Sequence, residues 1–335
     1  MRGKVSIKAY EIEGKMLAFT TREDVEMEET AARGWLRAVS ESDARVRQMN
    51  EADLERILEL RSVVRWSADP RAFDLLRGVR DARWAVAEAP DGSLVGMVGA
   101  VPLGSIGILC HLAVHDEHRG SGLGARLSAW AVAYLRSRGV GTIRLYSTRR
   151  AEGLYRSLGF AAVAPRTVYR LEASRGAFGR APETSEVHSV ETLAFGDLPE
   201  LYGVDRWSYG ADRSALVFAT LRLHPGLGLV ARDSSGRISG YLIRSSAGRT
   251  TRIGPFLAAT PDVARRLLTR ALEGTRSAPV QVAVPGPAGC PAHALLEEFG
   301  FVGRPDRLRM ELGGTSSAAC RAGLVHYGTT PYLAT

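Results

Sequence analysis

The hydrophobic pattern between residues 84 and 171 predicts strands followed by a helix. Two apolar runs of strand length, Trp84–Glu88 and Leu94–Val101, flank the turn sequence Pro90-Asp91-Gly92 and predict a hairpin. A third apolar run, Ile106–Val114, leads into a glycine-rich stretch. The chain therefore presents three neighbouring strands before this helical segment.

After the glycines, apolar residues recur at helical spacing, at Leu123, Leu127, Trp130, Ala131 and Tyr134. Gly139 is expected to end this helix. A strand over Thr142–Tyr146, a short helix over Ala151–Leu158 and a last strand over Thr167–Leu171 follow. Upstream, Val46 lies on an expected strand, and Asn50 with Asp53 predicts a capped helix start.

Six residues between the third strand and the helix, Arg119-Gly120-Ser121-Gly122-Leu123-Gly124, can hold an anion. Such a stretch leaves several backbone amides pointing outward, with the positive end of the helix dipole behind them. Glycine suits this role because it has no Cβ to block the ligand and it tolerates positive φ. An ordinary tight turn would have the same composition, so the surrounding elements must decide.

This loop and a later segment resemble the GNAT superfamily, the acyl-CoA-dependent N-acyltransferases. The family's loop reads Arg or Gln, two residues, Gly, one residue, then Gly or Ala, and is matched at Arg119, Gly122 and Gly124. Its later segment Ala-x-x-Leu-Tyr-x-x-Leu-Gly-Phe is matched at Ala151, Leu154, Tyr155, Leu158, Gly159 and Phe160. The resemblance covers residues 44–172.

The resemblance implies acetyl-CoA as co-substrate, its pyrophosphate on the glycine-rich loop and its pantetheine arm along Ile108–Val114 as an added strand. Parallel neighbouring strands would have to diverge to admit that arm, and a backbone N–H near Leu112 would polarise the thioester carbonyl. The implied contacts are Leu112, Ala113, Val114, Arg119, Gly120, Ser121, Gly122, Leu123, Gly124, Thr148, Ala151 and Tyr155. Thr148 stands where the family often has Asn, which puts that contact in doubt.

Tyr155 is the expected general acid. A phenol has an ordinary pKa of ~10, above the ~8.5 of a thiol, so it can donate a proton to the leaving thiolate. The alternative is that Tyr155 only packs beside Leu154 and Leu158.

The general base is less defined: His111 is the candidate, Cys110 is its neighbour on the same strand, and Glu117 in the loop is expected to be solvated. Strand alternation places Cys110 and His111 on opposite faces, although a bulge common in the family would alter this. His111, His115 and His118 have no acidic partner fixed by spacing, so we expect no metal.

The acceptor pocket is expected to involve the loop over Val63–Asp74 and the second half of the chain. The candidate substrate residues are Arg65, Trp66, Asp69, Asp212 and Arg213. Asp205, Asp212 and Arg213 would equally suit surface or interdomain salt bridges.

The second half repeats the first in weakened form. Leu295–Phe301 repeats Leu154–Phe160, and Ala231–Gly240 repeats the hairpin pattern of Ala87–Gly96. Phe256–Leu272 contains no glycine, and Leu296 stands where Tyr155 stands in the first half. Tyr209–Ser214 with Ile253–Phe256 resembles the second domain of certain bacterial and archaeal tandem acetyltransferases.

We therefore expect an α/β protein of the α+β type with two GNAT-like domains, each a mixed, mostly antiparallel β-sheet flanked by helices. The expected parts are an N-terminal extension (1–43), a catalytic GNAT domain (44–172), a linker (173–186), a degenerate GNAT-like domain (187–314) and a C-terminal tail (315–335). The extension could be structured, a flexible arm, or translation from an upstream start codon.

Composition limits the cellular setting. The 335 residues carry a net charge of +8, with lysine only at Lys4, Lys8 and Lys15. This balance suits coenzyme A and would also suit nucleic acid, but no nucleic-acid-binding motif is present and we do not expect that partner. Three dispersed cysteines, Cys110, Cys290 and Cys320, fit a reducing cytoplasm. The uncharged stretch Ser93–Val114 divides at a turn into two strand-length pieces, so we expect no membrane span, and we see no secretion signal.

These observations predict an acetyl-CoA-dependent N-acetyltransferase acting on a primary amine of a small metabolite or amino-acid-like molecule. Acetylation of a protein amine and a non-catalytic acyl-CoA-binding regulator remain as alternatives. The sequence leaves open whether the protein is a monomer or a homodimer.

Overall fold

The computed structural model describes residues 9–12, 15–18, 43–64, 66, 70–173, 189–273, 275, 278–287, 289–314 and 324–329. The expected linker lies mostly outside the described residues, as do Cys320 and most of the N-terminal extension. Within the extension, β1 (Ala9–Ile12) and β2 (Lys15–Ala18) form a separate antiparallel hairpin.

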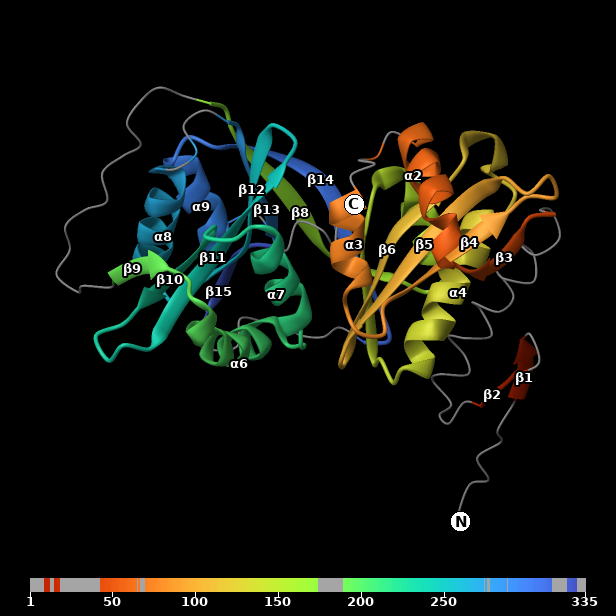
Figure 1. The fold of residues 1–335 in the computed structure, drawn as a ribbon, viewed down its shortest axis with the longest axis horizontal. Helices are drawn as coiled ribbons and strands as arrows, with labels where there is room; N and C mark the ends of the chain where they lie inside the picture. The colour runs from red at the N-terminus through yellow and green to blue at the C-terminus, as the bar shows by residue number, and fades with distance from the viewer. Residues whose placement is uncertain are drawn as a thin grey trace, which may run out of the picture.

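The first half follows the expected order of elements (Figure 1). Its strands are β3 (Arg45–Gln48), β4 (Arg83–Glu88), β5 (Leu94–Leu103), β6 (Ile106–Val114), β7 (Thr142–Ser147) and β8 (Ala161–Leu171). Its helices are η1 (Glu51–Asp53), α2 (Leu54–Val63), α3 (Pro70–Arg77), η2 (Asp116–His118), α4 (Leu123–Ser137), η3 (Arg149–Ala151) and α5 (Glu152–Ser157). The sheet is mixed, because only β6 and β7 are parallel neighbours.

The second half repeats this order. Its strands are β9 (Ser189–Thr192), β10 (Gly228–Arg232), β11 (Ile238–Ala247), β12 (Thr250–Ala258), β13 (Val280–Pro285), β14 (Val302–Leu312) and β15 (Val325–Gly328). Its helices are η4 (Phe195–Asp197), α6 (Leu198–Tyr209), α7 (Ser214–Leu223), α8 (Pro261–Glu273) and α9 (Pro291–Glu298). β15 pairs with β12, so residues 324–329 of the expected tail belong to this half.

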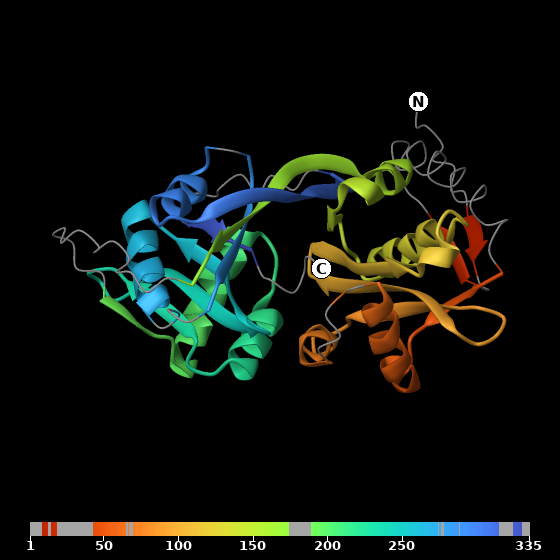
Figure 2. The same cartoon turned by 90° about the horizontal axis from the view of Figure 1, so that it is seen from above.

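The two halves exchange their long strands β8 and β14 and thereby share one sheet. The strand order is β3-β4-β5-β6-β7-β14-β8-β13-β12-β11-β10-β9. The C-terminal part of β14 pairs with β7 of the first half, whereas the C-terminal part of β8 pairs with β13 of the second. Figure 2 shows these two strands crossing between the halves.

Helices cover both faces of each half. In the first, α2 and α3 cover one face with a core around Phe73 and Trp84, and α4 and α5 cover the other around Leu127 and Leu135. In the second, α6 and α7 lie opposite α8 and α9. α7 also packs against α3, and Leu216 enters the first half's core. The α2–α3 side of the first half therefore packs against the second half.

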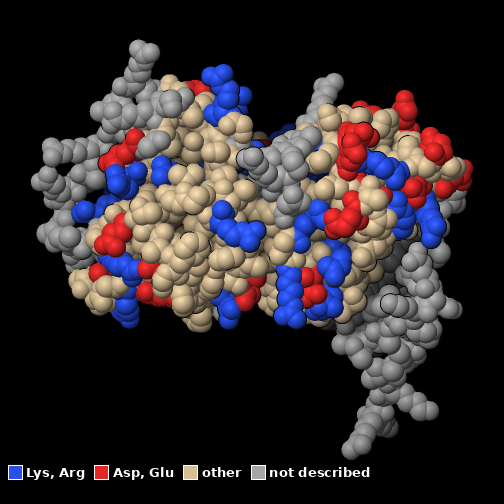
Figure 3. All heavy atoms as spheres, viewed as in Figure 1, with Lys and Arg blue, Asp and Glu red and all other residues tan. Residues whose placement is uncertain are grey.

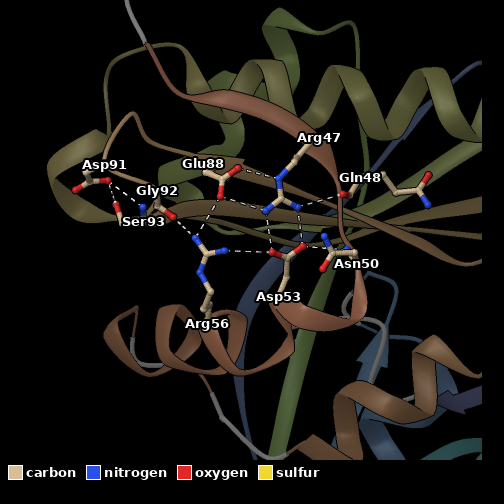
Figure 4. A network of polar contacts seen from close by, with 9 residues as sticks. All are labelled: Arg47, Gln48, Asn50, Asp53, Arg56, Glu88, Asp91, Gly92 and Ser93. Carbon is tan, nitrogen blue, oxygen red and sulfur yellow. Dashed lines mark hydrogen bonds and ion pairs between the residues drawn. The ribbon is translucent and has the colours of Figure 1, made fainter.

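An ionic network fixes the start of α2, as expected from Asn50 and Asp53 (Figure 4). The Asn50 amide donates to the Asp53 carboxylate at 2.9 Å, and Arg47 donates to both carboxylate oxygens at 2.7 and 2.8 Å. Arg47 also donates to Glu88 at 2.9 Å, and the Arg56 side chain reaches the Gly92 carbonyl. The network therefore ties β3, α2, β4 and the hairpin turn together.

The charged side chains on the face drawn in Figure 3 mix both signs. Lys and Arg lie among Asp and Glu there and form no continuous basic stripe. Among the described helices, none is long and apolar enough to cross a membrane.

Candidate active site

β6 and β7 separate at the point where an extended ligand would enter. They pair in parallel at Ile106–Thr142, Gly107–Ile143 and Ile108–Arg144, and within the described residues their pairing ends there. β6 continues to Val114 while paired on its other side with β5. Residues 109–114 therefore present one strand edge that β7 does not cover, as a pantetheine arm would require.

The glycine-rich loop presents its amides at the end of that edge. Gly120 and Gly122 have φ values of 83° and 78°, which L side chains adopt only with strain. No group in the described parts of the chain accepts a hydrogen bond from the amides of residues 120–124. These amides lie at the N-terminus of the 15-residue helix α4, where the helix dipole favours an anion.

The side chains of Leu154 and Arg119 border the amides of this loop. A Cβ on Gly124 would lie 3.3 Å from Leu154 Cδ2, so a larger residue there would crowd α5. Arg119 folds back over the loop, donating from Nε to the Val114 carbonyl at 3.1 Å and pairing with Asp116 at 2.5 Å. Binding of a diphosphate by this loop stays a prediction.

A bulge in β6 decides which way Cys110 and His111 face. Met97 pairs with Ala113 and Gly99 with Cys110, so Val98 lies opposite two residues, and His111 has φ 55°. His111 then contacts the rings of Trp66, Phe73 and Trp84, with centroids 6.0–6.4 Å apart, while Cys110 belongs to the same core. The simple alternation that would separate them is wrong here, because the bulge turns both toward α2 and α3.

The chemistry of Cys110 follows from its burial. Its side chain is buried, and burial raises the pKa of the thiol to about 12. The thiol therefore keeps its proton at neutral pH and is not a ready nucleophile.

Tyr155 on α5 is 5 % exposed and packs edge-on against Phe160, with ring centroids 5.8 Å apart. Burial raises the pKa of its phenol above the ordinary value, and the nearby charge of Arg307 opposes that rise. Cys110 lies close enough to influence the same pKa. Tyr155 thus packs in the core, within electrostatic reach of Cys110 on β6 and Arg307 on β14. Thr148 and Ala151 lie just before it, at η3.

The other histidines and Glu117 lie elsewhere. Glu117 is exposed in the loop, and His115 and His118 contact one another with ring centroids 6.0 Å apart. His111 is buried away from them. In the described parts of the chain, no three His, Cys, Asp or Glu side chains form a group that could hold a metal ion.

The structure describes three of the five candidate substrate residues. Trp66 lies beside His111 and beneath the Arg61 guanidinium, 5.6 Å from its ring centroid, whereas Arg65 and Asp69 lie outside the described residues. Asp212 precedes α7, and its carboxylate accepts from the Ser214 amide and hydroxyl at 3.0 and 2.6 Å.

Arg213 is buried against Asp205, with Nη2 and Nε 2.7 and 2.8 Å from the two carboxylate oxygens. The Tyr241 hydroxyl donates to the same carboxylate. The Asp212 amide donates to the Leu103 carbonyl at 3.1 Å, across the two halves. The hydrogen bond from Asp212 to Leu103 therefore joins the second half to β5 of the first, while Arg213 is buried in its ion pair with Asp205.

Comparison with known families decides the assignment. Residues 51–160 match the Acetyltransferase (GNAT) family, and residues 202–322 match the Acetyltransferase (GNAT) domain. The chain is a tandem GNAT protein.

Relatives of this tandem GNAT protein agree with its architecture. It is 24% identical over 225 residues to the uncharacterized N-acetyltransferase YitH of Bacillus subtilis, covering 67% of this chain and 76% of that protein. The structure of a putative acetyltransferase from Pyrococcus horikoshii matches with a TM-score of 0.68 at 19% identity, covering 87% of this chain and 96% of that one. A tandem GNAT protein from the clavulanic acid biosynthesis pathway has a TM-score of 0.60 at 16% identity, covering 82% of this chain and 100% of its own.

In the second GNAT half, the described residues show no equivalent opening. β12 and β13 also diverge after three parallel pairs, but β15 lies in the opening, pairing Leu257 with His326 and Ala258 with Val325. The Thr329 amide donates to the Ala283 carbonyl at 2.8 Å, which ties the segment to β13. The chain itself therefore occupies the position that a pantetheine arm would take in this half.

The start of α8 is equally unlike the start of α4. Thr260 accepts a hydrogen bond from the Val263 amide at 3.3 Å, and Pro261 has no amide to offer. Leu296, in the position of Tyr155, is fully buried among apolar side chains. Among the residues that the structure describes, the glycine-rich stretch before α4 thus has no counterpart before α8.

Sequence reasoning did not find Arg307, which approaches Tyr155 from the second half of the chain. Its proximity depends on the exchange of β14 into the first sheet. The only sequence signal is the run of three arginines at Arg304, Arg307 and Arg309 in a strand that is otherwise a repeat of β8.

Proposed function

We propose that this tandem GNAT protein transfers an acetyl group from acetyl-CoA to a primary amine of a small acceptor, using the site in its first half. The observation that carries the proposal is the run of five amides at residues 120–124 that donate to no described group, at the end of the open edge of β6. A diphosphate on those amides would align a pantetheine arm with residues 109–114.

Direct transfer suits the side chains around that edge. The amine nitrogen attacks the thioester carbonyl, the carbon–sulfur bond breaks, and the amide and free thiol are the products. Tyr155 would give its proton to the leaving sulfur, and a backbone N–H near Leu112 would stabilise charge on the carbonyl oxygen. The protonated Cys110 thiol argues against an acyl-cysteine intermediate.

The amine must lose a proton, because an ordinary ammonium has a pKa of ~10.4. His111 lies on the bulge next to that carbonyl position and is our candidate base, either directly or through water. Trp66, Phe73 and Trp84 around it would shape an acceptor site of limited volume. This apolar surrounding favours a small acceptor over an extended peptide. The free thiols of Cys110 and Cys290 fit our proposal of a cytoplasmic location.

A thiol-release screen across amines, polyamines, amino acids, aminoglycosides and peptide N-termini tests the proposal. Tyr155→Phe should slow release strongly while leaving acetyl-CoA binding intact. Tyr134→Phe is the matched control, because Tyr134 lies on α4 and its hydroxyl donates to the Asp81 carbonyl, before β4 and away from the site. A protein that binds acetyl-CoA but releases no thiol with any amine would instead be a regulator.

A binding measurement tests the loop separately. Gly124→Arg should remove the heat of acetyl-CoA binding in calorimetry, because the side chain would occupy the cradle beside Leu154. Equal binding by this variant and the wild type would contradict the proposal.

A further inference from the structure

Four arginines gather where the exchanged strands meet β7. Arg144 lies on β7, Arg166 on β8, and Arg307 and Arg309 on β14. Two carboxylates face them: Glu311 lies 2.7 Å from Arg144, and Asp306 accepts from Arg166 Nε at 2.9 Å. Four guanidinium groups thus share two carboxylates.

Strand register makes this crowding of positive charge explicit. Arg307 lies directly opposite Arg166 in the β8–β14 ladder, and like charges in that position destabilise a sheet. Asp306 is the extra residue of a bulge between Pro305 and Arg307, and it turns its carboxylate to Arg166. Burial and Arg166 both lower the pKa of Arg307.

Arg307 and Arg309 have spare hydrogen-bonding capacity. No described group accepts a hydrogen bond from either guanidinium, and both Nε atoms are buried. The nearest carboxylate oxygens lie 3.8 Å from Arg307 Nε, on Asp306, and 3.6 Å from Arg309 Nε, on Glu311. The side chains keep 24% and 15% exposure, so a ligand can reach them.

The arginines face away from the side where the donor's phosphates would bind. Leu308, Met310 and Leu312 pack into the core under α4 and α5. Of these two helices, α4 is the one that begins at the glycine-rich loop. Alternation along β14 therefore directs Arg307 and Arg309 to the opposite face, beside α6 and α7. Arg144 confirms this side, because its guanidinium lies over the Tyr209 ring at 5.4 Å. The charge of Arg307 still reaches Tyr155.

We infer that the acceptor amine carries an oxyanion group, carboxylate or phosphate, which Arg307 and Arg309 bind on the face opposite the donor. The inference rests on the proposed function and names its substrate class. Guanidinium groups suit both oxyanions because they donate paired, charge-assisted hydrogen bonds. A bound anion would also relieve the repulsion between Arg307 and Arg166.

Matched amine pairs test the inference. β-Alanine is compared with β-alaninamide for a carboxylate, and O-phosphoethanolamine with ethanolamine for a phosphate. The anionic member of at least one pair should be preferred by 10-fold or more in kcat/KM. Arg307→Gln should raise the KM for that acceptor about 10- to 100-fold while leaving the KM for acetyl-CoA unchanged. Arg307→Lys should restore part of the loss.

Arg304→Gln is the control, because Arg304 lies on the same strand and is exposed. It should change none of these constants. Equal use of both members of each pair, or a rise in the KM for acetyl-CoA instead, would overturn the inference while leaving acetyl transfer intact.

A second readout does not need turnover. In calorimetry with saturating coenzyme A, inorganic phosphate should bind the wild type and lose about 10-fold or more in affinity in Arg307→Gln. No binding to the wild type, or equal binding to both, would overturn the inference even if no amine in the panel reacts.

Discussion

Arg144 donates a hydrogen bond from Nε to Glu311 Oε1 at 2.7 Å, and the two residues come from opposite halves of the chain. Both side chains are buried, at 3% and 1% exposure. Their strands, β7 and β14, are neighbours only because β14 has crossed into the first sheet. The ion pair therefore marks the exchange of strands that makes the two halves one structure.

Replacing Glu311 with Gln should destabilise the protein by about 3–5 kcal/mol, because it removes the carboxylate facing two guanidinium groups. Urea denaturation measures the change. Glu152→Gln is the control, since its pair with Arg156 is solvent-exposed and worth ~0.5 kcal/mol or less. Similar losses in the free energy of unfolding in both variants would show that the buried ion pair stabilises the protein no more than the exposed one.

Gly120→Ala should weaken acetyl-CoA binding far more than Gly139→Ala. The two glycines have φ values of 83° and 76°, and in neither case would a Cβ meet another atom within 4 Å. Both substitutions therefore carry similar backbone strain, about 1–2 kcal/mol, but only Gly120 lies in the amide cradle. Calorimetry should give one site per chain for the wild type, because β15 and Thr260 leave no second cradle. Two sites, or equal effects of the two variants, would contradict this account.

Tyr155→Phe should lower kcat about 100- to 10,000-fold with little change in acetyl-CoA affinity. Burial raises the pKa of Tyr155, so the wild-type phenol remains protonated across the neutral and mildly alkaline range. The rate should then rise with pH as the acceptor amine loses its proton, without a decline below about pH 10 caused by the acid. Thiol release between about pH 6 and pH 10 measures the profile. A decline near neutral pH in the wild type that is absent from the variant would contradict the assignment.

Local features of the fold could be predicted because they depend on residues close in sequence. Ile106–Val114 forms β6 over those same residues, and Leu123 begins α4. The Asp91 turn recurs at Asp233, with each carboxylate accepting from a serine amide at 2.9 Å, so the repeat is visible at both levels. Apolar periodicity and turn chemistry are enough for such elements.

The exchange of β8 and β14 could not be predicted from these patterns. Each strand has an apolar pattern that fits either neighbour, and only the tertiary structure selects between them. For the same reason, the sequence could not predict that Arg307 lies near Tyr155 or that β15 pairs with β12. At His111, the bulge reverses a side-chain direction that simple alternation gave wrongly, since one extra residue changes the face of every residue after it.

His326 on β15 should make stability depend on pH between about pH 4 and 6.5. Burial, together with the nearby Arg213, lowers its pKa from 6.5 to about 4, while a contact with the Ser208 carbonyl opposes the shift. Within this window the unfolded chain binds a proton that the folded chain does not, so the free energy of unfolding falls as pH falls, by up to about 3 kcal/mol. His326→Gln should remove this dependence in urea denaturation, whereas His118→Gln, in the exposed loop, should keep it. Equal slopes against pH in the wild type and His326→Gln would contradict the lowered pKa of His326 in the folded protein.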